Sequence, residues 1–114
     1  MRRVSYYSAG QNWHRRDQRY RHLTLQVTVG HEHFRSLDWS MGGIRIDGIP
    51  EGVGIGDEVA LSFAGTRRGQ QWSATVPAVV VRIDWNRRYT AFHYPKLPSA
   101  AFDALEALIT GTGH

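Results

Sequence analysis

The sequence predicts a small all-β domain, either an antiparallel barrel or a closed sheet, with one helix at its C-terminal end. Short runs of alternating apolar and polar residues are separated by turn residues, as expected for half-buried strands. Helical spacing of apolar residues is found only in the last segment. The chain has 114 residues, 41% of them hydrophobic, which suits a single domain (1–114) with a core of its own.

The expected elements follow in order after a polar segment, residues 1–22, which has no periodicity and is expected to be a flexible arm. The barrel is assigned to residues 23–97. The expected strands are Leu23–Val29, His31–Leu37, Ile44–Ile46, Glu58–Phe63, Gln71–Trp85 and Tyr89–Tyr94. Turn chemistry is found at Gly30, Asp38–Gly43, the glycine-rich loop 48–57, Thr66–Gln70 and Asn86–Arg88. Pro77 marks an edge or a bulge, because proline cannot donate to a strand ladder.

The C-terminal segment 98–110 is expected to be a helix that begins at Pro98 or Ser99. Gly111 is a plausible C-cap. Apolar residues recur there at helical spacing: Phe102, Leu105, Leu108 and Ile109. Such a stripe must cover another surface, most simply the preceding sheet or barrel.

The positive charge of the chain is concentrated in the arm. The formal net charge is +4, and 13 of the 14 basic residues are arginine. Residues 1–22 hold six arginines and one aspartate, so they carry +5, whereas the remainder holds eight basic and nine acidic residues. Arginine favours planar, forked contacts with phosphate groups or base edges. An anionic partner is therefore expected to bind near the arm.

Several classes of function are disfavoured by the sequence. There is no cysteine, hence no disulfide or thiolate site, and no apolar run is long enough to insert into a membrane. The N-terminus lacks the apolar stretch of a secretory signal, so a cytoplasmic location is the default expectation. No serine lies in a nucleophile-elbow context, which disfavours an enzyme. His31 and His33 could share a strand face, but they lack a third ligand at a telling spacing, so no metal site is predicted.

Two motifs carry the functional prediction. Arg15 and Arg19 form an Arg-x-x-x-Arg spacing, which is uninformative alone in a chain this rich in arginine. Residues Asp38–Gly43 form an Asp-x-Ser-x-x-Gly pattern, and such a pattern with Asp or Asn at the first position is expected by chance only about 0.05 times at this composition. The second motif follows the first in order, with strands between them.

Together these motifs resemble the signature of the PilZ domain, the bacterial receptor for cyclic di-GMP, and the resemblance spans roughly residues 14–110. It implies a six-stranded antiparallel PilZ-type β-barrel with a C-terminal helix. It also implies that Arg15 and Arg19 clamp guanine and phosphate while Asp38 and Ser40 hold the ligand from the barrel. Arg16 and Gly43 complete the expected site.

The chemistry of these side chains agrees with a guanine ligand. Arginine can fork onto guanine O6 and N7 or onto phosphate, and a carboxylate such as Asp38 can accept from guanine N1–H and N2–H₂ together. Ser40 can donate to phosphate or hold the turn, and Gly43 permits a close backbone approach or a positive φ. Secondary candidates are Arg21, His14, Trp39 and Gly42. Tyr20, Arg21 and His22 precede the first expected strand, so Arg21 could take the role given to Arg19.

The predicted function is therefore a non-catalytic cyclic di-GMP receptor with no cofactor. Ligand binding would order its arm, and it would signal in trans to an effector protein of unknown identity. By resemblance the outputs include motility, exopolysaccharide synthesis and biofilm formation. DNA is not expected as the main partner. Two alternatives stay open: a PilZ-like adaptor that binds only proteins, and a basic barrel that binds RNA or single-stranded DNA through its arginines and aromatics.

Overall fold

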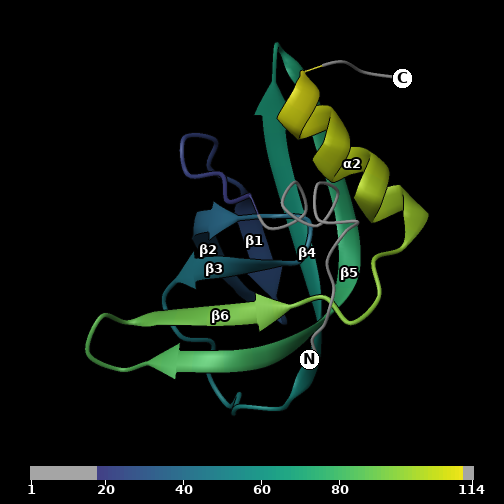
Figure 1. The fold of residues 1–114 in the computed structure, drawn as a ribbon. Coiled ribbons are helices and arrows are strands. Elements are labelled where there is room, and N and C mark those ends of the chain that lie inside the picture. Colours follow the sequence, from purple (N-terminus) through teal and green to yellow (C-terminus); the bar gives the residue numbers. More distant parts are fainter. Residues whose placement is uncertain (1–17, 112–114) are drawn as a thin grey trace, which may run out of the picture.

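The structure, a computed structural model, describes residues 18–111 and forms a closed barrel of antiparallel strands with one helix in that range (Figure 1). The strands are β1 (Gln26–Val29), β2 (Glu32–Trp39), β3 (Gly43–Asp47), β4 (Glu58–Arg67), β5 (Gln70–Asp84) and β6 (Tyr89–His93). They close in the order β1-β2-β3-β6-β5-β4. The predicted six-stranded antiparallel barrel with a C-terminal helix is confirmed.

The core fills the barrel because the strands alternate between inward apolar and outward residues. In β1, Val27 and Val29 are buried, and in β4 Leu61 and Phe63 are buried, while the residues between them are more exposed. Such alternation is the period of a strand with one face on the core. In β2, the register shift between Ser36 and Asp38 changes this alternation, so that Trp39 faces the core and Asp38 faces outward.

Helix α2 (Ser99–Thr110) lies along β4 and β5, where these long strands extend beyond the rest of the barrel (Figure 1). Its buried residues are Ala101, Ala104, Leu105, Ala107 and Leu108. The alanines bring the helix backbone close to the strands. Gly111 ends the helix with φ 74° and donates its N–H to the Ala107 carbonyl at 2.8 Å, which confirms the predicted C-cap.

The prediction is wrong for one residue of the apolar helix stripe. Leu105 and Leu108 are fully buried as expected, and Ile109 is half-buried. Phe102, however, is 41% exposed. Periodicity assigned the helix face from its large residues alone, whereas the buried face combines Leu105 and Leu108 with three alanines.

Several predicted boundaries also need correction. Strand β1 begins at Gln26 rather than Leu23, and β4 continues to Arg67, so the predicted turn from Thr66 is shorter. Asp38 and Trp39 belong to β2 rather than to a turn, because Trp39 pairs with Ile44 on β3. The turn begins only at Ser40, and this change determines where the Asp38 carboxylate lies.

Pro77 lies on an edge, one of the two predicted settings. It pairs with Ala60 of β4, and pairing of β5 with β6 begins only at Val79. At Pro77, β5 therefore has a strand partner on one side only. Within residues 18–111, no helix is long and apolar enough to cross a membrane.

Candidate functional site

The end of β2 presents Asp38 on the outside of the barrel. Trp39 is fully buried in the core, and its indole Nε1–H donates to the Leu23 carbonyl at 2.8 Å. Neighbouring residues of a strand point to opposite faces, so Asp38 points away from the core. A register shift between Ser36 and Asp38 interrupts the pairing with β3, and bulges of this kind re-aim side chains. Asp38 is nevertheless only 2% exposed, because other side chains cover it.

The turn after Trp39 is held by Ser40. The Ser40 N–H donates to the Gly43 carbonyl at 2.8 Å, and the Ser40 hydroxyl accepts from the Gly42 N–H at 3.1 Å. A Cβ on Gly43 would overlap the backbone carbonyl oxygen of Phe92 on β6. Of the two predicted reasons for this glycine, the structure supports the close backbone approach, since Gly43 is not among the positive-φ residues.

Arg19 is placed at the site because the next residue, Tyr20, is hydrogen-bonded to Trp39. Tyr20 and Trp39 exchange two backbone hydrogen bonds, of 2.7 and 3.0 Å, and their rings lie 5.0 Å apart. Arg19 then donates from Nε to Asp38 Oδ1 at 3.1 Å and from Nη1 to the Ser40 hydroxyl at 3.0 Å, and its Nη2 forms an ion pair with Asp38. The structure thus brings the second motif arginine to the Asp-x-Ser turn. Arg19, rather than Arg21, occupies this position.

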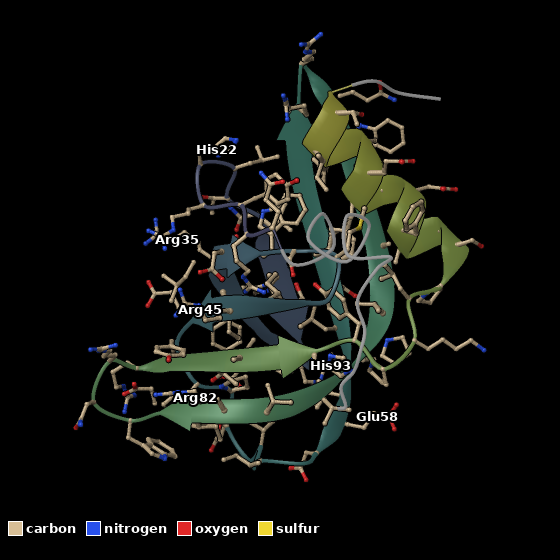
Figure 2. The ribbon with its side chains drawn as sticks, viewed as in Figure 1. His22, Arg35, Arg45, Glu58, Arg82 and His93 are labelled. Atoms are coloured by element: carbon tan, nitrogen blue, oxygen red, sulfur yellow. The ribbon has the colours of Figure 1, made fainter. Side chains whose placement is uncertain are left out.

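Arg45 is the residue that sequence reasoning missed. It lies directly opposite Asp38 in the β2–β3 pair, and its Nε is 3.1 Å from Asp38 Oδ1 and 3.0 Å from Oδ2. Its Nη2 forms a second ion pair with Asp38, and its guanidinium lies over the Tyr89 ring, 5.1 Å from the centroid. Figure 2 shows Arg45 on β3, beside β6. The sequence signal that could have identified Arg45 is its position in the strand that directly follows the Asp-x-Ser turn.

The two arginines keep Asp38 ionised. Burial by itself raises the pKa of the Asp38 carboxyl, but the hydrogen bonds and positive charges of Arg45 and Arg19 oppose this and hold the pKa below its ordinary value. The hydrogen bond to Asp38 raises the pKa of Arg45 further above its already high value. Asp38 is therefore a buried anion that already has donors on both oxygens.

A cavity of about 650 Å³ opens beside this cluster. Its lining includes four of the expected site residues, Arg19, Asp38, Ser40 and Gly43, and two of the secondary candidates, Arg21 and Gly42. It also includes residues that were not predicted: Ile44, Arg45, Val81, Ala91, Phe92 and His93. Figure 2 shows His93 on β6 near the end of that strand. Three arginines against one aspartate make the cavity cationic.

The other predicted residues are not in the described lining of this cavity. Trp39 packs in the core, so it does not contact the cavity through its ring. His14, Arg15 and Arg16 lie outside the described residues. His33 bonds Thr28 through its ring nitrogen, at 3.1 Å. Across residues 18–111, no group of three or more histidine, cysteine, aspartate or glutamate side chains could hold a metal ion.

Comparison with known proteins bears on the fold. No protein-family model and no curated protein sequence matches the chain. Among solved structures, the chain is similar to the PilZ domain of CeSA from a cellulose-synthesizing bacterium, with a TM-score of 0.59 and 15% sequence identity. The similarity covers 83% of this chain and 97% of that one. With its closed six-stranded barrel and C-terminal helix, the chain therefore has a PilZ-type fold.

Proposed function

We propose that this protein is a non-catalytic receptor for cyclic di-GMP, which binds in the cavity beside Asp38. One observation carries the proposal: the structure joins the second motif arginine, Arg19, to Asp38 and Ser40 of the other motif at the mouth of one cavity. Arg19 and Asp38 are 19 positions apart in the sequence. Their meeting in a PilZ-type fold supports a shared binding role.

The cavity matches the ligand in charge. Arg19, Arg21 and Arg45 against Asp38 give a net charge of +2 with His93 neutral, and cyclic di-GMP carries two phosphodiester charges. Guanidinium groups bind phosphate and the O6/N7 edge of guanine in the same forked geometry. The Asp38 carboxylate adds an acceptor that a purely phosphate-binding site would not need. Arg15 and Arg16 would contribute from the preceding segment, with His14 beside them.

The proposed consequence of binding is a change of surface. Ligand contacts with Arg15, Arg16 and Arg19 would fix the N-terminal segment against the barrel, and an effector protein would recognise the altered surface in the cytoplasm. Motility, exopolysaccharide or biofilm control would be the downstream process.

The test is calorimetric titration of the full chain with cyclic di-GMP and with cyclic di-AMP. We expect binding of the guanine ligand and rejection of the adenine ligand, because adenine presents an acceptor to Asp38. Arg19→Ala and Asp38→Ala should each weaken binding about 10- to 100-fold, the effect of losing one charged hydrogen-bonding group. Arg35→Ala is the matched control, since Arg35 is an exposed strand arginine with a carboxylate only at 3.7 Å.

The same experiment separates the alternatives. No heat from the parent protein with cyclic di-GMP would contradict the proposal and favour a protein-only adaptor. Binding of single-stranded RNA or DNA with steep salt dependence and little guanine selectivity would instead support the nucleic-acid alternative. Equal affinities of the parent, Arg19→Ala and Asp38→Ala proteins would refute the site assignment.

A further inference from the structure

Asp38 is shared by two arginines that are held to different degrees. Arg45 lies in the middle of β3, a strand paired on both sides, with β2 and with β6. Arg19 lies ahead of β1, in a segment attached to the barrel by the isolated bridge between Tyr20 and Trp39. A residue inside a paired sheet moves less easily than one next to a single bridge. The Arg19–Asp38 ion pair should therefore open more easily than the Arg45–Asp38 ion pair.

The contacts divide the Asp38 carboxylate between the two arginines. Arg19 reaches Oδ1 only, from Nε and Nη2, and its other contact is the Ser40 hydroxyl. Arg45 binds Oδ2 from both Nε and Nη2, and its Nε also lies within reach of Oδ1. The face of the Arg45 guanidinium is supported by the buried Tyr89 ring. Oδ2 is thus held by Arg45, which is fixed in the sheet, and Oδ1 is held by Arg19, which can be exchanged for a ligand.

This arrangement limits how a ligand can use Asp38. Both carboxylate oxygens already accept donors, so an incoming N–H edge must displace one set of them. Leaving a buried carboxylate without donors is costly, so the displaced donor must be replaced at once. Arg19 is the donor that can leave Asp38. A ligand bound in the cavity beside Arg19 would give its guanidinium a phosphate or base acceptor in exchange.

We infer that Arg19 is a latch that closes on Asp38 when the site is empty, and that Arg45 is a positioning residue that stays on Asp38 when the ligand replaces Arg19. This inference rests on the proposed function, and it adds to it both a regulatory step and a residue outside the two motifs. Binding then exchanges Arg19–Asp38 contacts for ligand–Asp38 and ligand–Arg19 contacts, while Arg45 keeps the carboxylate charged and aimed.

The first test observes the arginine Nε–H signals by NMR in the full chain. Arg19→Lys and Arg45→Lys variants assign the two signals. Without ligand, we expect both Nε–H protons to exchange slowly with water. With saturating cyclic di-GMP, the Arg19 signal should shift strongly, and the Arg45 signal should keep its slow exchange. A fast-exchanging Arg19 in the free protein, or loss of Arg45 protection on binding, would overturn the inference.

The second test asks whether Arg45 aims Asp38. Cyclic di-IMP lacks the N2 amine that a correctly aimed carboxylate would accept from. We expect the parent protein to bind cyclic di-GMP at least about fivefold more tightly than cyclic di-IMP, the discrimination expected for one hydrogen bond. Arg45→Met should bind cyclic di-GMP at least about tenfold more weakly and should discriminate less than about twofold between the two ligands. Arg35→Met is the matched control and should behave like the parent.

The outcomes separate the two proposals. No binding of cyclic di-GMP by the parent would refute the proposed function and this inference together. Binding by the parent with unchanged affinity and discrimination in Arg45→Met would refute this inference alone. If Arg45→Met fails to fold, Arg45→Lys keeps the charge but not the fork, and it should still lose discrimination between the two ligands.

Discussion

Two of the open cavities formed by residues 18–111 are similar in size but opposite in charge. The Asp38 cavity measures about 650 Å³, and a second cavity near the β1–β2 turn measures about 770 Å³. The first is lined by three arginines around one aspartate, whereas the charged residues among the described lining of the second are Glu32 and Glu51, with His31 beside them. An anionic ligand is attracted by the first potential and repelled by the second. Charge, rather than volume, identifies the candidate site.

The carboxylates of the two cavities also have different roles. Glu32 accepts the backbone N–H of Glu51 at 2.7 Å, so it ties the β1–β2 turn to the loop before β4. That is a structural contact made by a single acceptor. Asp38 instead holds two arginine side chains whose outer parts face a cavity. A carboxylate that orients cations is suited to a binding site in a way that a loop clamp is not.

The largest expected effect is on the free energy of unfolding when one glycine from the lining of each cavity is changed to alanine. Gly43→Ala forces a Cβ into the Phe92 carbonyl of the neighbouring strand, so we expect a loss of about 2–3 kcal/mol. Gly30 lines the second cavity and has open space around it but a φ of 63°, so Gly30→Ala should cost about 1 kcal/mol. Urea unfolding monitored by tryptophan fluorescence measures both.

Gly42→Ala is the control for this prediction. A Cβ at Gly42 meets nothing closer than the Ser40 hydroxyl at 3.8 Å, so the variant should unfold within about 0.5 kcal/mol of the parent. Equal losses for Gly42→Ala and Gly43→Ala would show that the close approach of β3 and β6 is not what requires glycine.

A smaller effect is expected on ligand affinity when one charge of each cavity is removed. Arg21 lines the Asp38 cavity, and among the described residues it has no ion pair that holds it elsewhere. Arg21→Ala should weaken cyclic di-GMP binding about fivefold, roughly 1 kcal/mol, because it removes one partly screened charge. Glu51→Gln in the other cavity should change affinity less than about twofold, since its charge lies away from the ligand. Calorimetry at low and at moderate salt would reveal the reverse ranking if the second cavity were the binding site.

The sequence predicted only part of what distinguishes the two cavities. The resemblance of the two motifs to the PilZ signature implied that Arg19 would share a site with Asp38, Ser40 and Gly43, and the structure brings these four to one place. Strand alternation predicted a small barrel or a closed antiparallel sheet, and the resemblance implied the six-stranded barrel. These predictions succeed because they depend on local periodicity and on a short motif whose spacing is improbable by chance.

The rest depends on long-range geometry that periodicity does not contain. Arg45 meets Asp38 because the strand register places them opposite each other, and that register follows from a bulge near Leu37 and from a turn that starts at Ser40. The prediction for Phe102 fails because small residues, not large ones, let α2 approach β4 and β5. Register and close approach are settled by packing, after the local pattern has been fixed.

The smallest expected effect concerns the pH dependence of stability. Because the pKa of Asp38 is lowered in the folded protein, its ionised form adds stability that is fully present above the unfolded value of about 3.9 and is lost as the pH falls through the lowered folded value. The stability difference between the parent and Asp38→Asn, measured by urea unfolding, should therefore shrink between about pH 5 and pH 2. Both arginine side chains are about one third exposed, at 37% and 35%, so water and salt weaken these ion pairs and the change stays below the Gly43→Ala loss.

The titration of the other carboxylates is common to the parent and Asp38→Asn, so it cancels in the difference. If the stability difference widens on acidification, burial rather than the two arginines dominates the pKa of Asp38. The cavity would then not contain an ionised Asp38 between its arginines.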